Sequence, residues 1–227
     1  MSVWAIGDIH GQAAMLEALL GALPRQPADT TVFLGDYLDR GPDSKKVVEF
    51  ALAQPNAVLL WGNHEDMAAF ALGEPWPSLL DYDPYDWYRN GGWDTCSSFN
   101  LSREEAFTRA CPELLLTLFS RLRTFWRDPQ TGIYFVHAGI PPGVAPEECD
   151  AETLLWDRES LGMLDRSGRF YVCGHTPQLE GRPRVLPDKI CLDTAAAYGG
   201  PLSALQLPER NLYQSFPDGK VTGPAII

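Results

Sequence analysis

The sequence predicts an α/β fold built on a parallel sheet, and two observations support this prediction. Within residues 1–72, short apolar runs alternate with longer segments whose apolar residues recur at helical spacing, which is typical of strands alternating with helices. Each apolar run ends in a Gly-Asp or Gly-Asn pair, and ligands of open α/β sheets bind at the carboxyl ends of strands. The chain has 227 residues, enough for one packed core, so we expect a single domain over residues 1–227.

The first part of the chain predicts three strands and three helices in alternation. The first helix stops before Pro24 and the second before Pro55, because proline cannot continue a helix. Asp43 or Ser44 is expected to cap the second helix. The predicted strands are Val3–Ile6, Thr31–Leu34 and Ala57–Trp61, and the predicted helices are Gln12–Leu23, Asp43–Ala53 and Glu65–Leu72.

Residues from about 73 to 122 are expected to form a helical and irregular insertion. The segment Gly73–Asn100 is rich in Pro, Trp, Tyr and Asp, and its stretch Asp81–Tyr88 is both aromatic and acidic. This stretch is either an aromatic substrate surface or an irregular segment that packs its rings over the helices. The segment Ser102–Leu122 predicts one or two helices, with Pro112 suited to a helix start.

The rest of the chain predicts shorter strands separated by turn residues. Glu152–Leu155 is expected to be a short helix, and Gly223–Ile227 either frays or docks. The predicted strands are Arg123–Trp126, Ile133–Val136, Arg169–Cys173, Lys189–Leu192, Ser203–Leu207 and Leu212–Phe216.

Composition excludes several classes of partner. The net charge is −12, from 18 basic and 30 acidic side chains, which argues against nucleic acid and against an anionic membrane surface. The five cysteines are odd in number and form no C-x-x-C pair, so we expect reduced thiols. No apolar run approaches the ~20 residues of a transmembrane helix, and the N-terminus has no signal-peptide pattern. We therefore expect a soluble, cytoplasmic protein.

All four histidines lie in short blocks that also contain Gly, Asp or Asn. A neutral imidazole is the commonest metal ligand. Together with Asp8, Asp36 and Asn63, the histidines supply enough N and O ligands for two divalent ions, the arrangement that clamps an in-line displacement at phosphorus. One such block is weak evidence, whereas five in this order are specific. The blocks are Gly7-Asp8-Ile9-His10-Gly11, Gly35-Asp36-Tyr37-Leu38-Asp39-Arg40-Gly41, Gly62-Asn63-His64-Glu65, His137-Ala138-Gly139 and Gly174-His175-Thr176.

With these blocks the chain resembles the calcineurin-like metallophosphoesterases, and among them the phosphoprotein phosphatase branch. The segments Leu154–Arg158, Leu192–Gly200 and Asn90–Gly92 are most similar to the small serine/threonine protein phosphatases of bacteria and bacteriophages. The resemblance covers nearly the whole chain. It implies a single-domain sandwich of two mixed β-sheets flanked by helices.

The resemblance also implies a role for each matching residue. The ions would be Mn²⁺ in the first place, with Fe or Zn²⁺ as alternatives. Arg40 and Arg158 would bind substrate phosphate together with Asn63, although Arg158 could instead be a surface arginine of a helix. His64 would be the general acid and Asp39 its partner, which favours the protonated imidazole. The implied ligands are Asp8 and His10 for the first metal, Asp36 for both metals, and Asn63, His137 and His175 for the second.

The chain departs from the family pattern at one position. Many members place an arginine, aimed at the phosphate, directly before the Gly-Asn-His-Glu block, and this chain has Trp61 there. The tryptophan is either an aromatic wall suited to a base or phenyl ring, or the buried end of a strand. The departure puts a strict phosphoserine/phosphothreonine protein phosphatase in question.

The function implied is a metal-dependent phosphatase that hydrolyses phosphomonoesters, namely phosphorylated Ser, Thr or Tyr side chains or small aryl phosphates. A hydroxide bridging the two metals would attack phosphorus directly, without a covalent enzyme intermediate. The alternative is a hydrolase of dinucleoside polyphosphates such as diadenosine tetraphosphate. A metal-free binding scaffold is a third interpretation, and the complete ligand set argues against it. The physiological substrate, the native metal and the oligomeric state stay open at this stage.

Overall fold

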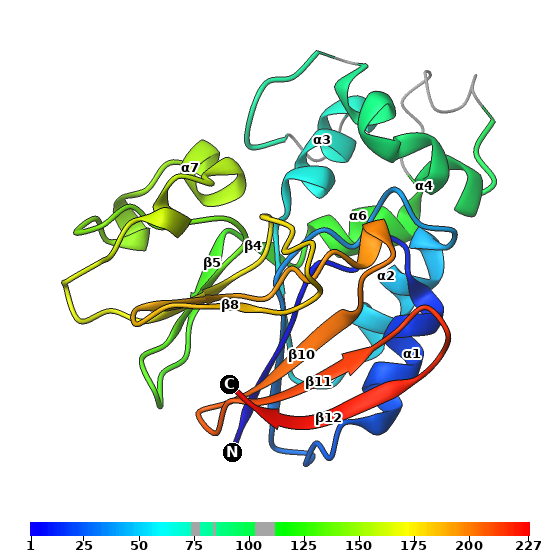
Figure 1. Ribbon diagram of the computed structural model, residues 1–227. Helices are drawn as coiled ribbons and strands as arrows, with labels where there is room; N and C mark the ends of the chain where they lie inside the picture. Colours follow the sequence, from blue (N-terminus) through cyan, green and yellow to red (C-terminus); the bar gives the residue numbers. More distant parts are fainter. Residues whose placement is uncertain (74–77, 84, 103–111) are drawn as a thin grey trace.

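Two mixed β-sheets lie face to face, and helices cover the outer face of the larger one (Figure 1). The computed structural model describes residues 1–73, 78–83, 85–102 and 112–227. The larger sheet has the strand order β12-β11-β10-β1-β2-β3-β4 and the smaller one β5-β6-β7-β9-β8. The expected α/β sandwich of two mixed sheets is therefore confirmed.

Within the larger sheet, β1 to β4 run parallel to one another, and β10 pairs antiparallel with β1. In the smaller sheet, β6, β7 and β9 are parallel, while β5 and β8 are antiparallel to their neighbours. The strands are β1 (Val3–Ile6), β2 (Thr30–Phe33), β3 (Ala57–Leu60), β4 (Leu122–Arg123), β5 (Phe125–Arg127), β6 (Tyr134–Val136), β7 (Tyr171–Cys173), β8 (Arg184–Val185), β9 (Lys189–Cys191), β10 (Leu202–Leu207), β11 (Asn211–Ser215) and β12 (Val221–Ile226).

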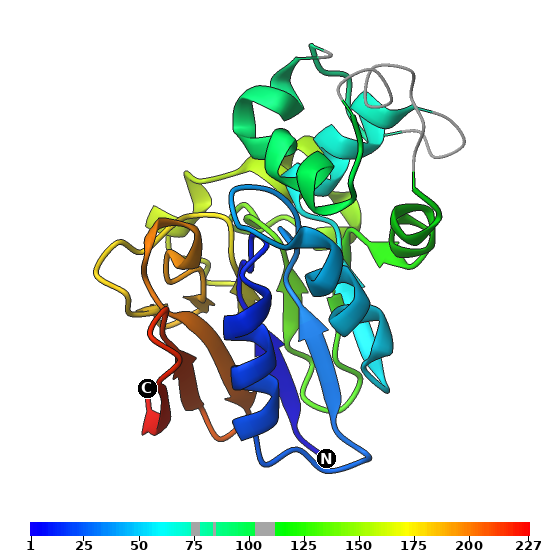
Figure 2. The same cartoon turned by 90° about the vertical axis from the view of Figure 1, so that its right-hand side faces the viewer.

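The helices occupy two different positions relative to the larger sheet. Helices α1 and α2 lie across one face of the larger sheet, and α3 and α4 lie beyond the end of its central strands (Figure 2). The Asp43 carboxylate caps α2 by accepting the backbone N–H of Lys46 at 3.0 Å, as the sequence predicts. The helices are α1 (Ala13–Ala22), α2 (Ser44–Ala53), α3 (Asn63–Leu72), α4 (Trp93–Ser98), α6 (Glu113–Phe119) and α7 (Ala151–Trp156), with a π-helical turn η1 (Tyr88–Gly92) and 3₁₀ turns at Pro146–Glu148, Ser160–Gly162 and Ala196–Tyr198.

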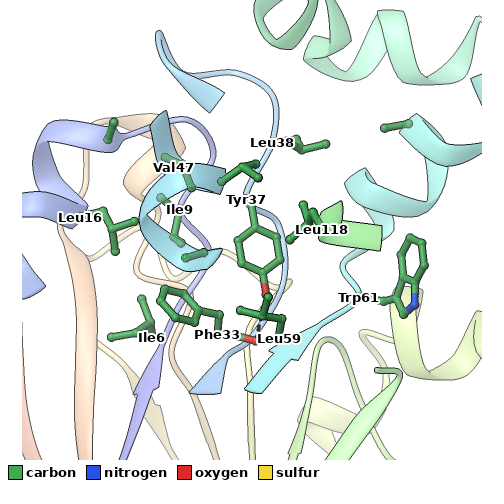
Figure 3. Packing of buried hydrophobic residues seen from close by; sticks show 14 of the residues in the cluster. Ile6, Ile9, Leu16, Phe33, Tyr37, Leu38, Val47, Leu59, Trp61 and Leu118 are labelled. Atoms are coloured by element: carbon green, nitrogen blue, oxygen red, sulfur yellow. Dashed lines mark hydrogen bonds between the residues drawn. The ribbon is translucent and has the colours of Figure 1, made fainter. Parts of the chain in front are cut away.

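Alternate residues of the central strands serve two different cores. Ile6 and Phe33 pack with the helices in one cluster, which Figure 3 shows around Tyr37. Ala5 and Val32 face the other way, toward Phe135 of the smaller sheet. Strand side chains point alternately to the two faces of a sheet, so the near-continuous apolar runs of β1 and β2 mark strands that are buried on both sides. Each fully buried large side chain contributes about 1.5–3 kcal/mol to stability.

Several predicted boundaries were wrong. The expected strand Arg123–Trp126 is two strands, since β4 pairs with β3 in the larger sheet and β5 pairs with β6 in the smaller one. The sequence analysis missed β8 and β12, and the C-terminus docks as β12 on β11. The turn η1 and helix α4 lie within residues 73–122, where a helical and irregular insertion was expected. The helix expected over Ser102–Leu122 is α6 in its last part, and its residues 103–111 lie outside the described residues.

Two further observations concern the surroundings of the protein. No helix in the described parts of the chain is long and apolar enough to span a bilayer. The thiols of Cys96, Cys149, Cys173 and Cys191 are free, and Cys111 lies outside the described residues.

Candidate active site

The loops that follow the parallel strands bring the predicted site residues together. Asp8 and His10 follow β1, Asp36 follows β2, and Asn63 and His64 are the first residues of α3, directly after β3. His137 and His175 follow β6 and β7 of the smaller sheet. Parallel strands present their carboxyl ends at one edge of a sheet, so the two sheets contribute to a shared site. The residues of this cluster are buried: Asp8, His10, Asp36, Asn63, His64, His137 and His175.

One group of donor atoms within 4.8 Å of one another belongs to His10, Asp36 and His64; of these, His10 and Asp36 are predicted ligands and His64 is the predicted proton donor beside them. His10 Nδ1 donates to the carbonyl oxygen of Leu38 at 2.8 Å. Burial lowers the pKa of His10 to about 3, so the ring is neutral and Nε2 carries a lone pair. That lone pair lies 3.3 Å from Asp36 Oδ2, which has no proton to offer.

The second group consists of Asp36, His137 and His175. His137 Nδ1 donates to the carbonyl oxygen of Leu34 at 2.8 Å, and burial lowers the pKa of His137. Its Nε2 therefore presents a lone pair 3.4 Å from Asp36 Oδ1 and 3.0 Å from Asn63 Oδ1. Facing lone pairs repel one another unless a cation lies between them, so this donor set fits divalent metal ions.

Asp8 supplies a further observation in favour of metal binding. Its Oδ1 is buried without a hydrogen-bond partner among the described residues, and its Oδ2 accepts the backbone N–H of His175 at 2.9 Å. Burial and the charges of Asp193 and Asp36 raise the pKa of Asp8. Burial also raises the pKa of Asp193 to about 7. Buried carboxylates this close together need positive charge nearby, and metal ions supply it.

His64 and Asp39 form a buried pair beside the ligand cluster. His64 Nδ1 donates to Asp39 Oδ2 at 2.6 Å, and the rings of His64 and His10 meet edge to face at 4.7 Å. Asp39 also accepts from Trp87 Nε1 at 3.0 Å and from Thr95 Oγ1 at 2.7 Å. Burial raises the pKa of Asp39, and these hydrogen bonds oppose the rise. His64 is thus held through Nδ1, and this bond leaves Nε2 unused.

Both predicted phosphate-binding arginines reach the cluster. Arg40 Nη1 donates to His10 Nε2 at 2.9 Å, and Arg158 Nε donates to His175 Nε2 at 3.2 Å. The structure therefore brings Arg158 to the site rather than leaving it on a distant helix face. A guanidinium offers several donors in one plane, which suits phosphoryl oxygens.

Glu65 organises the loop that carries Asp36, a role the sequence analysis did not assign. Its carboxylate accepts the backbone N–H groups of Asp36 at 2.8 Å, Tyr37 at 2.9 Å, Leu38 at 3.1 Å and Gly62 at 3.1 Å. In the sequence, only the position of Glu65 at the end of the Gly62–Glu65 block indicated that this carboxylate belongs to the site. Gly62 must be glycine for a related reason, because a Cβ there would collide with Asp36 Oδ1.

The backbone of the site is strained. Left-handed backbone angles are uncommon in residues other than glycine and cost of order 1–3 kcal/mol each. Such strain persists where the surrounding contacts fix the conformation, as the Glu65 carboxylate does for the Asp36 loop. The site residues with positive φ are His10, Asp36, Asp39, Arg40 and His175.

The two interpretations of Trp61 are separated by its position. Its side chain is 7 % exposed and lies among the core residues of Figure 3. Its ring stacks on Phe119 at 5.6 Å and 17°. Trp61 therefore packs in the core at the end of β3 and does not form an open wall of the site. The phosphate contact that an arginine would make at this position is absent from this side chain.

The aromatic segment 81–88 packs inward at the rings of Tyr82, Trp87 and Tyr88, of which Tyr88 is buried against Trp87. Trp87 is buried and bonded to Asp39, while Tyr82 donates to Asp66 at 2.9 Å and accepts from Trp156 Nε1 at 3.1 Å. These contacts favour the interpretation as an irregular segment with packed rings. Neither Trp87 nor Thr95 was predicted as a site residue. Both lie about fifty residues from Asp39 in the chain and outside every motif.

A cluster of buried histidines and carboxylates with facing lone pairs, two arginines and a histidine–aspartate pair defines a metal-dependent phosphoester hydrolase. The sequence model of the calcineurin-like phosphoesterase family matches residues 1–179 of this chain. The chain belongs to this family, as the motif blocks predicted.

The relatives within the family carry different names. Serine/threonine-protein phosphatase 1 of Salmonella typhimurium is 30% identical, over 90% of this chain and 91% of that protein. The asymmetrical bis(5'-nucleosyl)-tetraphosphatase PrpE of Oceanobacillus iheyensis is 27% identical, over 92% of this chain and 90% of that protein. A protein serine/threonine phosphatase structure from Saccharomyces cerevisiae superimposes with a TM-score of 0.60 at 16% identity, covering 100% of this chain and 80% of that chain. The last match supports the fold alone.

Proposed function

We propose that this protein is a metal-dependent phosphatase that hydrolyses phosphomonoesters, either phosphorylated Ser, Thr or Tyr side chains or small aryl phosphates. The observation that carries the proposal is the buried His64–Asp39 pair at 2.6 Å beside the cluster around Asp36. Such a pair places a proton donor next to a phosphate-binding centre, which a structural metal site would not need.

Two divalent ions, Mn²⁺ in the first place, would be held by the six predicted ligands. When bound, they would supply positive charge to the phosphoryl oxygens and lower the pKa of a bound water. A mixed set of carboxylate, amide and imidazole donors suits Mn²⁺, Fe and Zn²⁺. The assignment is Asp8 and His10 to one ion, Asp36 to both, and Asn63, His137 and His175 to the other.

The remaining residues orient the phosphoryl group and move a proton. Arg40 and Arg158 would leave the histidine nitrogens that they contact here and bind phosphoryl oxygens, with Asn63 assisting. His64 would donate the proton on Nε2 to the leaving oxygen, because its Nδ1 is committed to Asp39. Protonation of the leaving group contributes about 10²–10⁴-fold to the rate of such a reaction.

The test compares His64→Asn with the unchanged protein. Loss of the proton donor is expected to lower kcat for a phosphoserine peptide, whose alkoxide leaving group needs a proton, by at least about 10²-fold. Because His64 is assigned no ligand role, metal content measured by atomic emission is expected to stay at two ions per chain. Turnover at the unchanged rate would contradict the general-acid role, and activity that persists in metal-stripped protein with chelator would contradict the metal dependence.

The second candidate is hydrolysis of dinucleoside polyphosphates. Two observations favour it: the similarity to a bis(5'-nucleosyl)-tetraphosphatase over most of both chains, and a second arginine in the hollow beside Arg40. One panel separates the candidates: p-nitrophenyl phosphate, phosphoserine, phosphothreonine and phosphotyrosine peptides, and diadenosine tetraphosphate, each with Mn²⁺, Mg²⁺ or Zn²⁺. Hydrolysis of diadenosine tetraphosphate far faster than of every monoester would favour the second candidate.

A further inference from the structure

A hollow of about 410 Å³ adjoins the candidate active site on the side of Arg40. The Arg40 guanidinium bridges the two, because it donates to His10 Nε2 at 2.9 Å and lies 5.6 Å from the centre of the Tyr198 ring. The residues lining the hollow are Arg40, Arg89, Asn90, Gly91, Ala197 and Tyr198.

The backbone fixes this hollow against the active-site loop. Gly91 has φ 110°, and a Cβ on it would lie 2.8 Å from the backbone nitrogen of Arg40. Glycine therefore allows the turn η1 to approach the loop that carries Asp39 and Arg40. The close approach of Gly91 to Arg40 therefore fixes the backbone position of Arg89, which lies two residues before Gly91.

Arg89 is charged and available to a ligand. Its side chain is 68 % exposed, and its ion pair with Asp86 is long, at 3.8 Å. Exposed pairs of this kind contribute little, so the guanidinium can turn to an anion at small cost. The Asn90 side-chain amide donates to the Asp86 backbone carbonyl at 2.8 Å, which links the two residues across the turn.

The hollow beside Arg158 has the opposite character. It measures about 580 Å³, and its lining includes the carboxylates of Glu152, Asp157 and Glu159. In a chain of net charge −12, an anionic group attached to the scissile phosphate would be repelled from these carboxylates and attracted to Arg40 and Arg89. The charge distribution therefore favours a polyphosphate that extends from the candidate active site toward Arg89 and away from the carboxylates beside Arg158.

We propose that Arg89 is a specificity-determining residue, which binds the phosphoryl group next to the scissile one in a nucleoside polyphosphate. This inference rests on the proposed phosphoester hydrolase activity and adds a second subsite to it. A phosphomonoester fills only the centre between Arg40 and Arg158, whereas a polyphosphate extends from there to Arg89. Arg89 thereby sets how well the site accepts polyphosphates relative to monoesters.

The test measures the benefit of a second phosphoryl group on binding. Adenosine monophosphate and the non-hydrolysable α,β-methylene analogue of adenosine diphosphate are compared as inhibitors of p-nitrophenyl phosphate hydrolysis at saturating Mn²⁺, and by calorimetry. In the unchanged protein the diphosphate analogue should bind more tightly. In Arg89→Ala the ratio of the two affinities should fall about tenfold, since a charge-assisted hydrogen bond to phosphate is lost. Arg89→Lys should restore part of the ratio.

Arg166→Ala is the matched control. Arg166 is exposed and precedes the amino end of β7, the end opposite His175, so the ratio should not change in this variant. A ratio that stays constant in Arg89→Ala would overturn the proposal, and so would equal weakening of both ligands. Failure of the proposed function has a different signature, because no phosphoester would then be hydrolysed with any metal. Calorimetry would still measure the ratio of the affinities for the diphosphate analogue and adenosine monophosphate, so the two outcomes are distinguishable.

Discussion

A general acid must carry its proton on the nitrogen that faces the leaving group, and the contacts of His64 decide which nitrogen that is. Asp39 accepts from Nδ1 at 2.6 Å, which leaves Nε2 as the nitrogen that can carry a proton to the leaving group. Asp39 is itself fixed by Trp87 and Thr95. The orientation of His64 therefore depends on residues of the insertion, which act on it through two successive hydrogen bonds, one to Asp39 and one from His64 to Asp39.

Trp87→Phe tests this dependence at the scale of one residue. The substitution keeps a buried aromatic ring and removes the N–H that bonds both oxygens of Asp39. We expect kcat for a phosphoserine peptide, whose leaving alkoxide needs a proton, to fall about tenfold, because a hydrogen bond to a charged group contributes roughly 1.5–3 kcal/mol. KM should change little, since no substrate contact is lost. Steady-state kinetics at a temperature well below the melting point gives both constants.

Trp126→Phe is the control for this experiment. Trp126 lies in β5 and packs on Phe135 between the two sheets, so the same chemical change there should leave kcat as it was. If Trp87→Phe retains the unchanged kcat, or loses activity only through a raised KM, Trp87 does not position Asp39.

The motif blocks made the candidate ligands and His64 predictable from sequence. Each block combines a chemically suitable side chain with a place just after a strand, and those two properties suffice to bring Asp8, Asp36 and His137 together. Trp87 and Thr95 have neither property. Their contact with Asp39 depends on how the insertion folds back over the site, which no local pattern encodes.

At the scale of elements, the strands and helices of residues 1–72 were predictable because periodicity and stop signals agree there. The split of β4 and β5 was not, since Leu122 to Arg127 contains no Gly, Pro, Asn or Asp to mark a break and only the pairing partners separate the two strands. β12 contains Gly223 and Pro224, which are unfavourable inside a sheet and are tolerated because β12 is an edge strand.

Asp29 joins the start of β1 to the loop that precedes β2. Its carboxylate accepts the backbone N–H groups of Ser2 at 2.8 Å and Gln26 at 2.9 Å, and Trp4 Nε1 at 3.2 Å. Burial alone would raise the pKa of Asp29, but these hydrogen bonds lower it below its ordinary value. On acidification, Asp29 is therefore protonated in the unfolded chain at a higher pH than in the folded protein. The ionised carboxylate stabilises the folded state fully above the pKa of the unfolded chain, and this stabilisation is lost as the pH falls through the folded pKa.

Asp29→Asn should destabilise the protein in a pH-dependent manner. At pH 7 we expect the free energy of unfolding to fall by about 2 kcal/mol, because the amide replaces one accepting oxygen by a donor. The difference should shrink as the pH falls below about 4, where the carboxylate of the unchanged protein becomes protonated. Urea denaturation across this range measures it. The exposed carboxylate of Asp81 provides the control variant, Asp81→Asn, and a difference independent of pH would exclude the carboxylate mechanism.

At the scale of the whole molecule, two sheets of unequal size share one polar centre. The larger sheet contributes Asp8, His10, Asp36 and Asn63, and the smaller one contributes His137 and His175. The apolar cluster between the sheets holds these two sets together, and the buried carboxylates oppose it by mutual repulsion. Divalent ions that bind both sets would convert this repulsion into a link between the sheets.

Removal of metal should therefore lower the stability of the entire fold. Ligands that bind only the folded state stabilise it by about 2.7 kcal/mol at a concentration of 100 times Kd, which corresponds to roughly 5–10 °C in Tm for a chain of this size. Calorimetry of protein stripped with chelator should show a Tm lower by this amount than protein with Mn²⁺. His137→Gln, which removes a proposed ligand, should lose most of the metal-dependent rise, whereas Arg166→Ala should retain it. Equal Tm values with chelator and with Mn²⁺ would mean that metal ions do not link the two sheets.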